Sequence, residues 1–256
     1  MQFTVIALVF LFSMASVSAQ EAASTKVPDN QILITTKDKF PLTGQYFPGK
    51  KKADGFLVLH DCKSDSRPYH DIAKRISQAG FHALALDLRG FGNSVTPMVS
   101  HQNIKKNAKD IIAYQQQLAM ISAYWELDVL NAYDYLRDKV DNQFAISIFA
   151  VGCSAPFAVS TAEQMHVANM VLLSPEMDFI AKERYKNLTD IPSYFISPIH
   201  NIESYQTSKE LFEWNGHKRS KMLLFKGEHT DSQLLKRNPS LSADIASWLI
   251  ERGKQQ

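Results

Sequence analysis

The chain has 256 residues, of which 45% are hydrophobic, and its 28 Lys plus Arg against 26 Asp plus Glu give a formal charge of +2. This near-balance argues against a nucleic-acid-binding protein and against one that charge draws strongly to a membrane. The only dense basic run, residues 50–52, follows Pro48-Gly49 and is typical of a solvated turn.

The first nineteen residues are predicted to be a secretory signal. They contain no charged side chain and end in Val17-Ser18-Ala19, which favours signal-peptidase cleavage before Gln20. An uncleaved anchor is the alternative, because about seventeen apolar residues in a helix approach the thickness of a bilayer core. We therefore expect an exported protein, periplasmic or secreted, in which residues 20–256 form one domain without a further membrane span.

Beyond a polar lead-in, the hydrophobic pattern predicts eight strands, with helices between most of them. The strands are expected at 31–36, 42–47, 55–60, 81–88, from 144 onward, 169–173, 191–197 and 221–225. The helices are expected at 67–78, 103–138 with one break near residue 122, after the turn at 152–154, 204–214 and 240–252, with a short segment at 178–188. Strands separated by helices of this length imply right-handed crossovers and a mostly parallel sheet covered on both faces.

Residues 144–158, FAISIFAVGCSAPFA, read as a strand, a sharp turn and the start of a helix. A serine on such a turn holds its hydroxyl clear of the sheet, beside helix N–H groups. Here the serine is Ser154. The stretch resembles the nucleophile elbow of the α/β-hydrolase superfamily, Gly-x-Ser-x-Gly, with Pro156 in place of the last Gly; Pro suits the first turn of a helix.

Two earlier stretches carry the same resemblance. Residues 86–94, LDLRGFGNS, are close to the family's Asp-x-Arg-Gly-x-Gly-x-Ser, in which Gly90 and Gly92 would permit the turns. Residues 58–62, VLHDC, look like the family's strand-end His-Gly turn, with Asp61 in place of Gly. Asp tolerates left-handed backbone better than most residues.

Near the end of the chain, residues 226–231, KGEHTD, resemble the loop that delivers the family's catalytic histidine, which singles out His229. The resemblance thus covers nearly all of the mature chain and implies an α/β-hydrolase fold. Only residues 176–190 lie between the strands where many relatives insert a helical lid, so we expect little or no lid.

The resemblance implies a serine nucleophile, Ser154, with His229 as its base, and the base needs an acid that fixes its tautomer. The family pattern puts Asn201 at the acid position, where an amide supplies no charge; such a loss can cost on the order of 10⁴ in rate. Glu176 is the other candidate, and the residues do not decide between these and their neighbours Asp178 and Glu203.

The family's oxyanion hole would come from the backbone N–H groups of Cys62 and Ala155. Both cysteines of the chain, Cys62 and Cys153, fall on loops that face each other in this fold. Export to an oxidising compartment would allow a Cys62–Cys153 disulfide, with two free thiols as the alternative.

The sequence therefore predicts an exported serine hydrolase that acts on small carboxylic esters or similar acyl substrates. No metal-ligand spacing, phosphate loop or flavin motif is present, so no metal or cofactor is expected, and no nucleic-acid partner. The alternative is a catalytically inactive protein of the same fold that binds a ligand or partner, because the departures at Asp61, Pro156 and Asn201 all fall on active-site loops.

Overall fold

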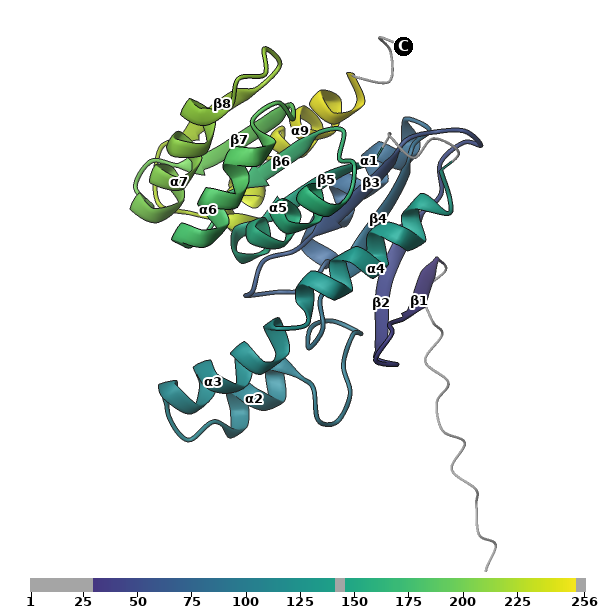
Figure 1. The fold of residues 1–256 in the computed structure, drawn as a ribbon, viewed down its shortest axis with the longest axis vertical. Coiled ribbons are helices and arrows are strands. Elements are labelled where there is room, and N and C mark those ends of the chain that lie inside the picture. The colour runs from purple at the N-terminus through teal and green to yellow at the C-terminus, as the bar shows by residue number, and fades with distance from the viewer. Residues whose placement is uncertain (1–29, 141–145, 252–256) are drawn as a thin grey trace, which may run out of the picture.

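An eight-stranded sheet forms the centre of the computed structural model, which describes residues 30–140 and 146–251 (Figure 1). The strands are β1 (Gln31–Thr35), β2 (Pro41–Phe47), β3 (Gly55–Leu59), β4 (His82–Asp87), β5 (Ile146–Val151), β6 (Met170–Leu173), β7 (Ser193–Pro198) and β8 (Lys221–Phe225). Their order in the sheet is β1-β2-β4-β3-β5-β6-β7-β8. Strand β2 is antiparallel to both of its neighbours, and every pairing from β4 to β8 is parallel, so the predicted mostly parallel sheet is confirmed.

Helices alternate with the strands from β3 onward. They are η1 (Arg67–Tyr69), α1 (His70–Gln78), α2 (His101–Asn107), α3 (Ile111–Ser122), α4 (Trp125–Arg137), η2 (Gly152–Ser154), α5 (Ala155–Gln164), α6 (Phe179–Tyr185), η3 (Lys186–Leu188), α7 (Ile202–Trp214), α8 (Asp231–Arg237) and α9 (Leu241–Ile250). The structure adds α8, which the sequence analysis missed because its seven residues are mostly polar.

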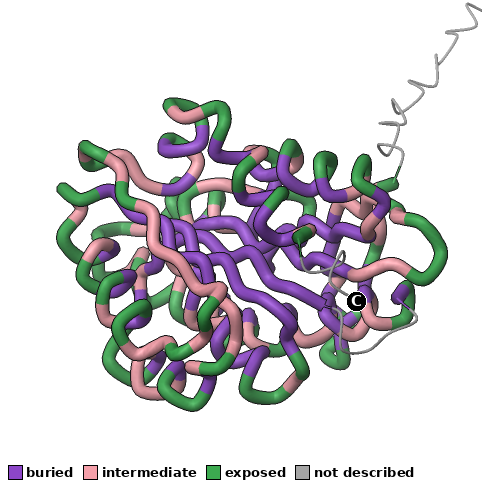
Figure 2. The backbone as a smooth tube through the Cα atoms, turned by 90° about the horizontal axis from the view of Figure 1, so that it is seen from above, coloured by how far each residue is buried: buried purple, intermediate pink, exposed green. Residues whose placement is uncertain are grey.

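The sheet is buried on both faces, and successive side chains of each central strand enter different cores. In β3, Leu57 and Leu59 face the core beneath α4, α5, α6 and α7, whereas Phe56 and Val58 face the one beneath α1, α8 and α9. Figure 2 shows the buried strands running through the middle of the molecule between exposed turns. This burial on both faces explains why the central strands read as continuous apolar runs in the sequence.

The motif at residues 86–94 has the structural role predicted for it. Gly90 and Gly92 have φ of +91° and +51°, and a Cβ on Gly92 would lie 2.2 Å from the Asp87 carboxylate. The Arg89 guanidinium is buried and bonds Asp128 of α4 through Nε at 2.9 Å and Nη2 at 2.7 Å. Its other edge reaches Asp38 in the β1–β2 turn. One side chain thereby ties the start of the sheet to a helix that covers it.

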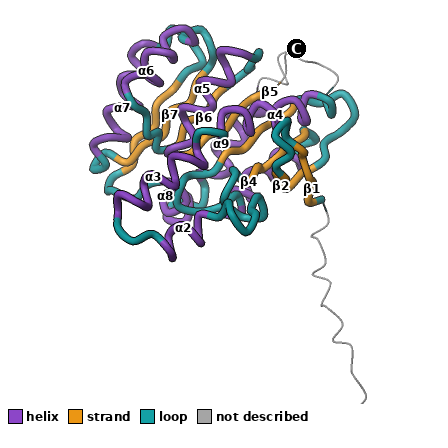
Figure 3. Tube along the Cα trace, turned by 60° about the horizontal axis from the view of Figure 1, so that its bottom comes forward, coloured by secondary structure: helices purple, strands orange, loops and turns teal. Residues whose placement is uncertain are grey.

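The helical region predicted at 103–138 with one break contains three helices. The break near residue 122 is confirmed, and a second one at residues 108–110 was missed. Helices α2 and α3 form a hairpin that projects from the body of the molecule, at the lower left of Figure 1 and again in Figure 3. The stretch after β6, where a lid was considered, holds only α6 and η3; the projecting hairpin follows β4 instead.

Two predictions concern membranes: the lack of a further membrane span, and a signal at residues 1–19. Among residues 30–140 and 146–251 no helix combines the length and apolar character needed to cross a bilayer. The predicted signal at residues 1–19 lies outside the described residues.

Candidate active site

The turn after β5 has the backbone of a nucleophile elbow, and the residue on it is Gly152. Its φ of +56° lies in the left-handed region, and Gly152 directly follows the last residue of β5 as the first residue of η2, which leads into α5. In this kind of elbow the strained residue carries the reactive side chain. Small residues, Ala150 and Ser154, stand two positions before and after it, where the family has glycines. The position of the nucleophile is therefore occupied by a glycine.

The prediction that Ser154 is the nucleophile is wrong in its register by two residues. Ser154 is fully buried, and its hydroxyl donates to the Val151 carbonyl at 2.9 Å and accepts from the Val151 N–H at 2.9 Å. It closes the first turn after the strand. The pattern Gly-x-Ser led to the error, because Gly152 was assigned to the flanking position when it holds the positive φ itself.

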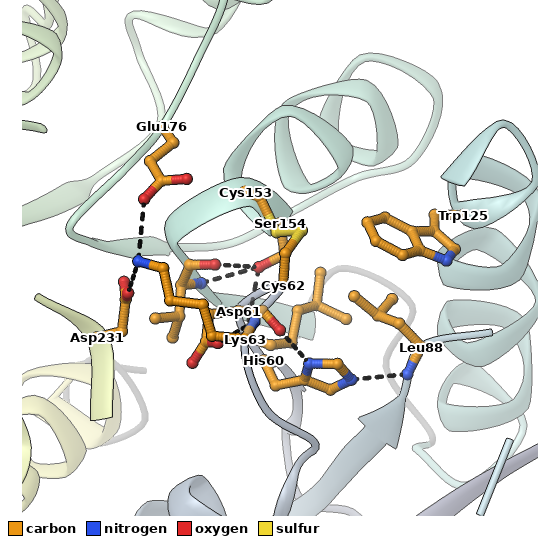
Figure 4. Close-up of a disulfide and its surroundings, with 12 residues drawn as sticks. His60, Asp61, Cys62, Lys63, Leu88, Trp125, Cys153, Ser154, Glu176 and Asp231 are labelled. Carbon is orange, nitrogen blue, oxygen red and sulfur yellow. Dashed lines mark hydrogen bonds and ion pairs between the residues drawn. A yellow bond between two sulfur atoms is a disulfide. The ribbon is translucent and has the colours of Figure 1, made fainter. Parts of the chain in front are cut away.

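The oxyanion assignment changes with the register. Ala155 follows Ser154, but its N–H donates to the Gly152 carbonyl and closes the helical turn, so it is not the donor predicted. The residue after the elbow is Cys153. Cys62 remains on the opposite loop, and the structure joins these two residues in the Cys62–Cys153 disulfide. The predicted disulfide is therefore present, and it links the two loops from which the family draws its oxyanion donors (Figure 4).

The structure does not bring the predicted base and acids to Ser154. His229 is half-exposed, and its Nδ1 lies 3.1 Å from the Gln233 amide oxygen of α8. Asn201 caps α7, accepting from the Ser204 N–H at 3.0 Å. Among the described residues no hydrogen bond links either side chain to Ser154.

The remaining acid candidates also have local roles. Asp178 caps α6 through the Ala181 N–H at 2.8 Å, and Glu203 lies in the first turn of α7. Asp and Glu near helix N-termini are stabilised by the helix dipole. Glu176 lies near the elbow, where its N–H donates to the Gly152 carbonyl at 3.1 Å, but its carboxylate contacts Lys63 rather than a histidine.

An ion-pair cluster that the sequence analysis missed covers the elbow. Lys63 Nζ lies 2.7 Å from Asp231 Oδ2 and 3.5 Å from Glu176 Oε1 (Figure 4). Asp231 is the first residue of α8, and its side chain is only 5% exposed. Its second oxygen, Oδ1, has no hydrogen-bond partner among the described residues and lies 3.0 Å from where a Cβ of Gly152 would stand. A carboxylate therefore lies beside the place of the missing nucleophile.

Burial shifts the pKa values of both carboxyl groups in this cluster. Burial raises the pKa of the Asp231 carboxyl, and Lys63 only partly opposes that rise. Burial also raises the pKa of Glu176, again against the attraction of Lys63. Lys63 is 168 residues from Asp231 in the chain, and the two residues adjoin the His60 turn and the His229 loop. That adjacency to family motifs was the only sequence signal that could have identified them.

Asp61 and His60 hold the β3 loop in place. The Asp61 carboxylate accepts from the Tyr69 hydroxyl and from the N–H groups of Lys63 and Ser64, at 2.6 and 3.0 Å. His60 is fully buried, so its pKa is lowered; Nδ1 lies 2.5 Å from the Asp61 carbonyl and Nε2 accepts from the Leu88 N–H at 2.9 Å. Asp61 thus stands where the family motif has a glycine, and its carboxylate holds the loop through these hydrogen bonds.

A cavity of about 910 Å³ lies next to this loop, over β2, the start of α1 and the turn after β4. Its lining includes Phe47, Ser64, Arg67, Lys74 and Phe91, and does not include Gly152. Lys74 makes no ion pair among the described residues. No group of three or more metal-binding side chains occurs in the part of the chain that the structure describes.

Comparison with solved structures gives the α/β-hydrolase fold. An esterase of Pyrococcus furiosus, Pf2001, matches with a TM-score of 0.60 and 16% identity over 87% of this chain and 91% of that one. A dienelactone hydrolase of Anabaena variabilis matches at 0.58 and 16%, over 84% and 92%, and the Penicillium α/β hydrolase GrgF at 0.58 and 13%, over 86% and 97%. No protein-family model and no curated protein matches the chain. These three structures are an esterase and two hydrolases, and at identities this low the structural likeness establishes a shared fold.

Proposed function

We propose that this protein, built on the α/β-hydrolase fold, binds a small ester or similar acyl compound and forms no acyl-serine intermediate. The observation that carries the proposal is Gly152, which puts no side chain on the one residue that the elbow presents. Ser154 is no substitute, because its buried hydroxyl already donates to and accepts from Val151. A serine attacks only when a base removes its proton, and among the described residues no histidine is hydrogen-bonded to this one.

The cavity of about 910 Å³ offers a site for the compound. Its volume falls within the range of small-molecule sites, which combine apolar walls with a few polar groups. Phe47 and Phe91 supply apolar surface for an acyl chain or ring, and Lys74 supplies a cation without an ion-pair partner among the described residues for a carboxyl or carbonyl oxygen. The cavity borders the loop that leads from the disulfide to α1.

The test combines fluorophosphonate labelling, release of nitrophenol from p-nitrophenyl butyrate, and calorimetric binding of butyrate and of the ester. We expect no label at Ser154 and no Ser154-dependent release, with Ser154→Ala as control. Val95 lines the cavity and is 38% exposed, so Val95→Trp should weaken binding at least about tenfold; Leu33→Trp, exposed and outside the lining, should not. Labelling at Ser154, or equal binding by both variants, would contradict the proposal.

A second candidate is hydrolysis by direct attack of water, favoured by the unpartnered Asp231 Oδ1 and by the esterases among the similar structures. A water beside Gly152 would give a proton to Asp231 as its oxygen bonds to the acyl carbon. The bond between that carbon and the ester oxygen would then break, and Asp231 would return the proton to the departing oxygen, which leaves as the alcohol. Nitrophenol release that persists in Ser154→Ala and is lost in Asp231→Asn would favour this candidate over binding alone.

We also propose that the chain is exported. The uncharged, apolar residues 1–19 support this proposal, and so does the Cys62–Cys153 bridge, because disulfides persist mainly in oxidising compartments. N-terminal sequencing of the protein recovered from outside the cytoplasm should begin at Gln20. An intact Met1 would favour the anchor instead.

A further inference from the structure

The tip of the α2–α3 hairpin combines exposed apolar side chains with lysines. Ile111 and Ile112, the first two residues of α3, are 64% and 62% exposed. Lys105, Lys106 and Lys109 lie in the exposed end of α2 and the turn that joins it to α3.

The exposed face of α3 carries no charge. The whole helix, IIAYQQQLAMIS, has no ionisable carboxylate or cation, and its outward positions are filled by Ile, Gln, Ala and Met. The one acid in the turn, Asp110, is the N-cap of α3 and accepts from the Ala113 N–H at 2.7 Å. The apolar surface of the tip is therefore accompanied by three lysines against one aspartate, and none of the three lysines forms an ion pair among the described residues.

The base of the hairpin is fixed to the body. His101 of α2 stacks on Phe91 with ring centroids 4.4 Å apart and bonds the Tyr114 hydroxyl of α3 at 2.8 Å. Ile121 at the other end of α3 is buried in the core. The hairpin thus holds its tip away from the rest of the molecule, as Figure 1 shows.

A comparison within the chain distinguishes this tip from an ordinary surface helix. Phe179 and Ile180 also open a helix, α6, and are 75% and 68% exposed. The cations beside them are paired with carboxylates: Lys182 with Glu210, Arg184 with Glu163, and Lys186 with Glu183. The three lysines of the hairpin have no such partners in the described part of the chain.

We propose that the α2–α3 tip docks on an anionic lipid surface, with Ile111 and Ile112 entering the interface and the three lysines facing lipid headgroups. Apolar side chains beside basic ones are what interfacial helices use, and each lysine near such a surface strengthens binding several-fold. The charge is local, so it is compatible with a formal charge of only +2 for the whole chain.

The experiment is flotation of the purified full-length protein with vesicles of phosphatidylcholine, alone or mixed with phosphatidylglycerol. We expect flotation with the anionic vesicles and roughly 100-fold weaker partitioning for Lys105→Gln/Lys106→Gln/Lys109→Gln. Ile111→Ser/Ile112→Ser should weaken it about tenfold or more, whereas Phe179→Ser/Ile180→Ser, the matched control, should not. All variants keep the same N-terminus, so residues 1–19 cannot cause a difference between them.

All the substituted residues are exposed, and thermal unfolding of each variant should match the wild type. Equal flotation of the Ile111→Ser/Ile112→Ser variant and its α6 control would overturn the proposal, as would equal binding to neutral and anionic vesicles. Failure to float, accompanied by dimerisation that the Ile111→Ser/Ile112→Ser variant abolishes, would assign the tip to contact with a second copy instead.

Discussion

Reducing the Cys62–Cys153 bridge should lower the free energy of unfolding by about 4–5 kcal/mol. The bridge closes a loop with a sequence separation of 91 residues. The chain-entropy relation gives about 2.1 + 3.0 ln 91, or roughly 15.6 cal/mol/K, which is about 4.7 kcal/mol at 25 °C. Reduction leaves every side-chain heavy atom in place, so it separates the effect of the covalent link from loss of packing.

Urea unfolding of the protein with and without reductant measures this difference. With a denaturant slope of about 2–3 kcal/mol/M, the midpoint should fall by roughly 2 M. Because the link acts on the unfolded chain, most of the change should appear as slower refolding rather than faster unfolding. A difference below about 1 kcal/mol, or one carried wholly by the unfolding rate, would refute the reasoning and indicate an unfolded chain that is already compact.

Three further outcomes follow from the structure. Gly152→Ala should lower the free energy of unfolding by about 1–3 kcal/mol in a thermal melt, because its φ is +56° and the new Cβ would lie 3.0 Å from Asp231. Gly216→Ala should change it little, because its Cβ would meet only the Thr189 carbonyl oxygen, at an ordinary 4.0 Å. Arg89→Met should destabilise by about 3–5 kcal/mol because Asp128 would remain buried without its partner, and adding Asp128→Leu should restore much of the loss in the same melt. The raised pKa means that Asp231 binds its proton more tightly in the folded state, so ionising this carboxyl lowers the free energy of unfolding as the pH rises through that pKa. Asp231→Asn should therefore raise the free energy of unfolding, measured by chemical denaturation, more at pH 7 than at pH 4. An equal effect at both pH values would contradict the raised pKa.

The sheet was predictable from the sequence because strands that are buried on both faces consist of consecutive apolar residues. Each central strand is a short apolar run, and the helices between them are long enough to require crossovers. The structural role of the motif around Arg89 and the closeness of Cys62 to Cys153 could also be predicted, from the local sequence together with the family resemblance.

The site was not predictable in the same way. Whether Gly152 or Ser154 occupies the elbow depends on which residue takes a positive φ, and a Gly-x-Ser pattern fits both registers. The Lys63–Asp231 pair joins residues 168 positions apart, so no local pattern encodes it. Ala150 and Ser154, small residues on either side of Gly152, were the only local sign of the correct register.

The position of the two cysteines bears on how the chain would oxidise during export. A chain that crosses a membrane from its N-terminus exposes Cys62 well before Cys153, since β4, α1 and the projecting hairpin lie between them. The sequence contains two cysteines in all, so Cys62 cannot form a wrong intramolecular disulfide before Cys153 emerges. Oxidation would therefore yield the native bridge in one pairing, without the slow reshuffling that chains with more cysteines require of an isomerase.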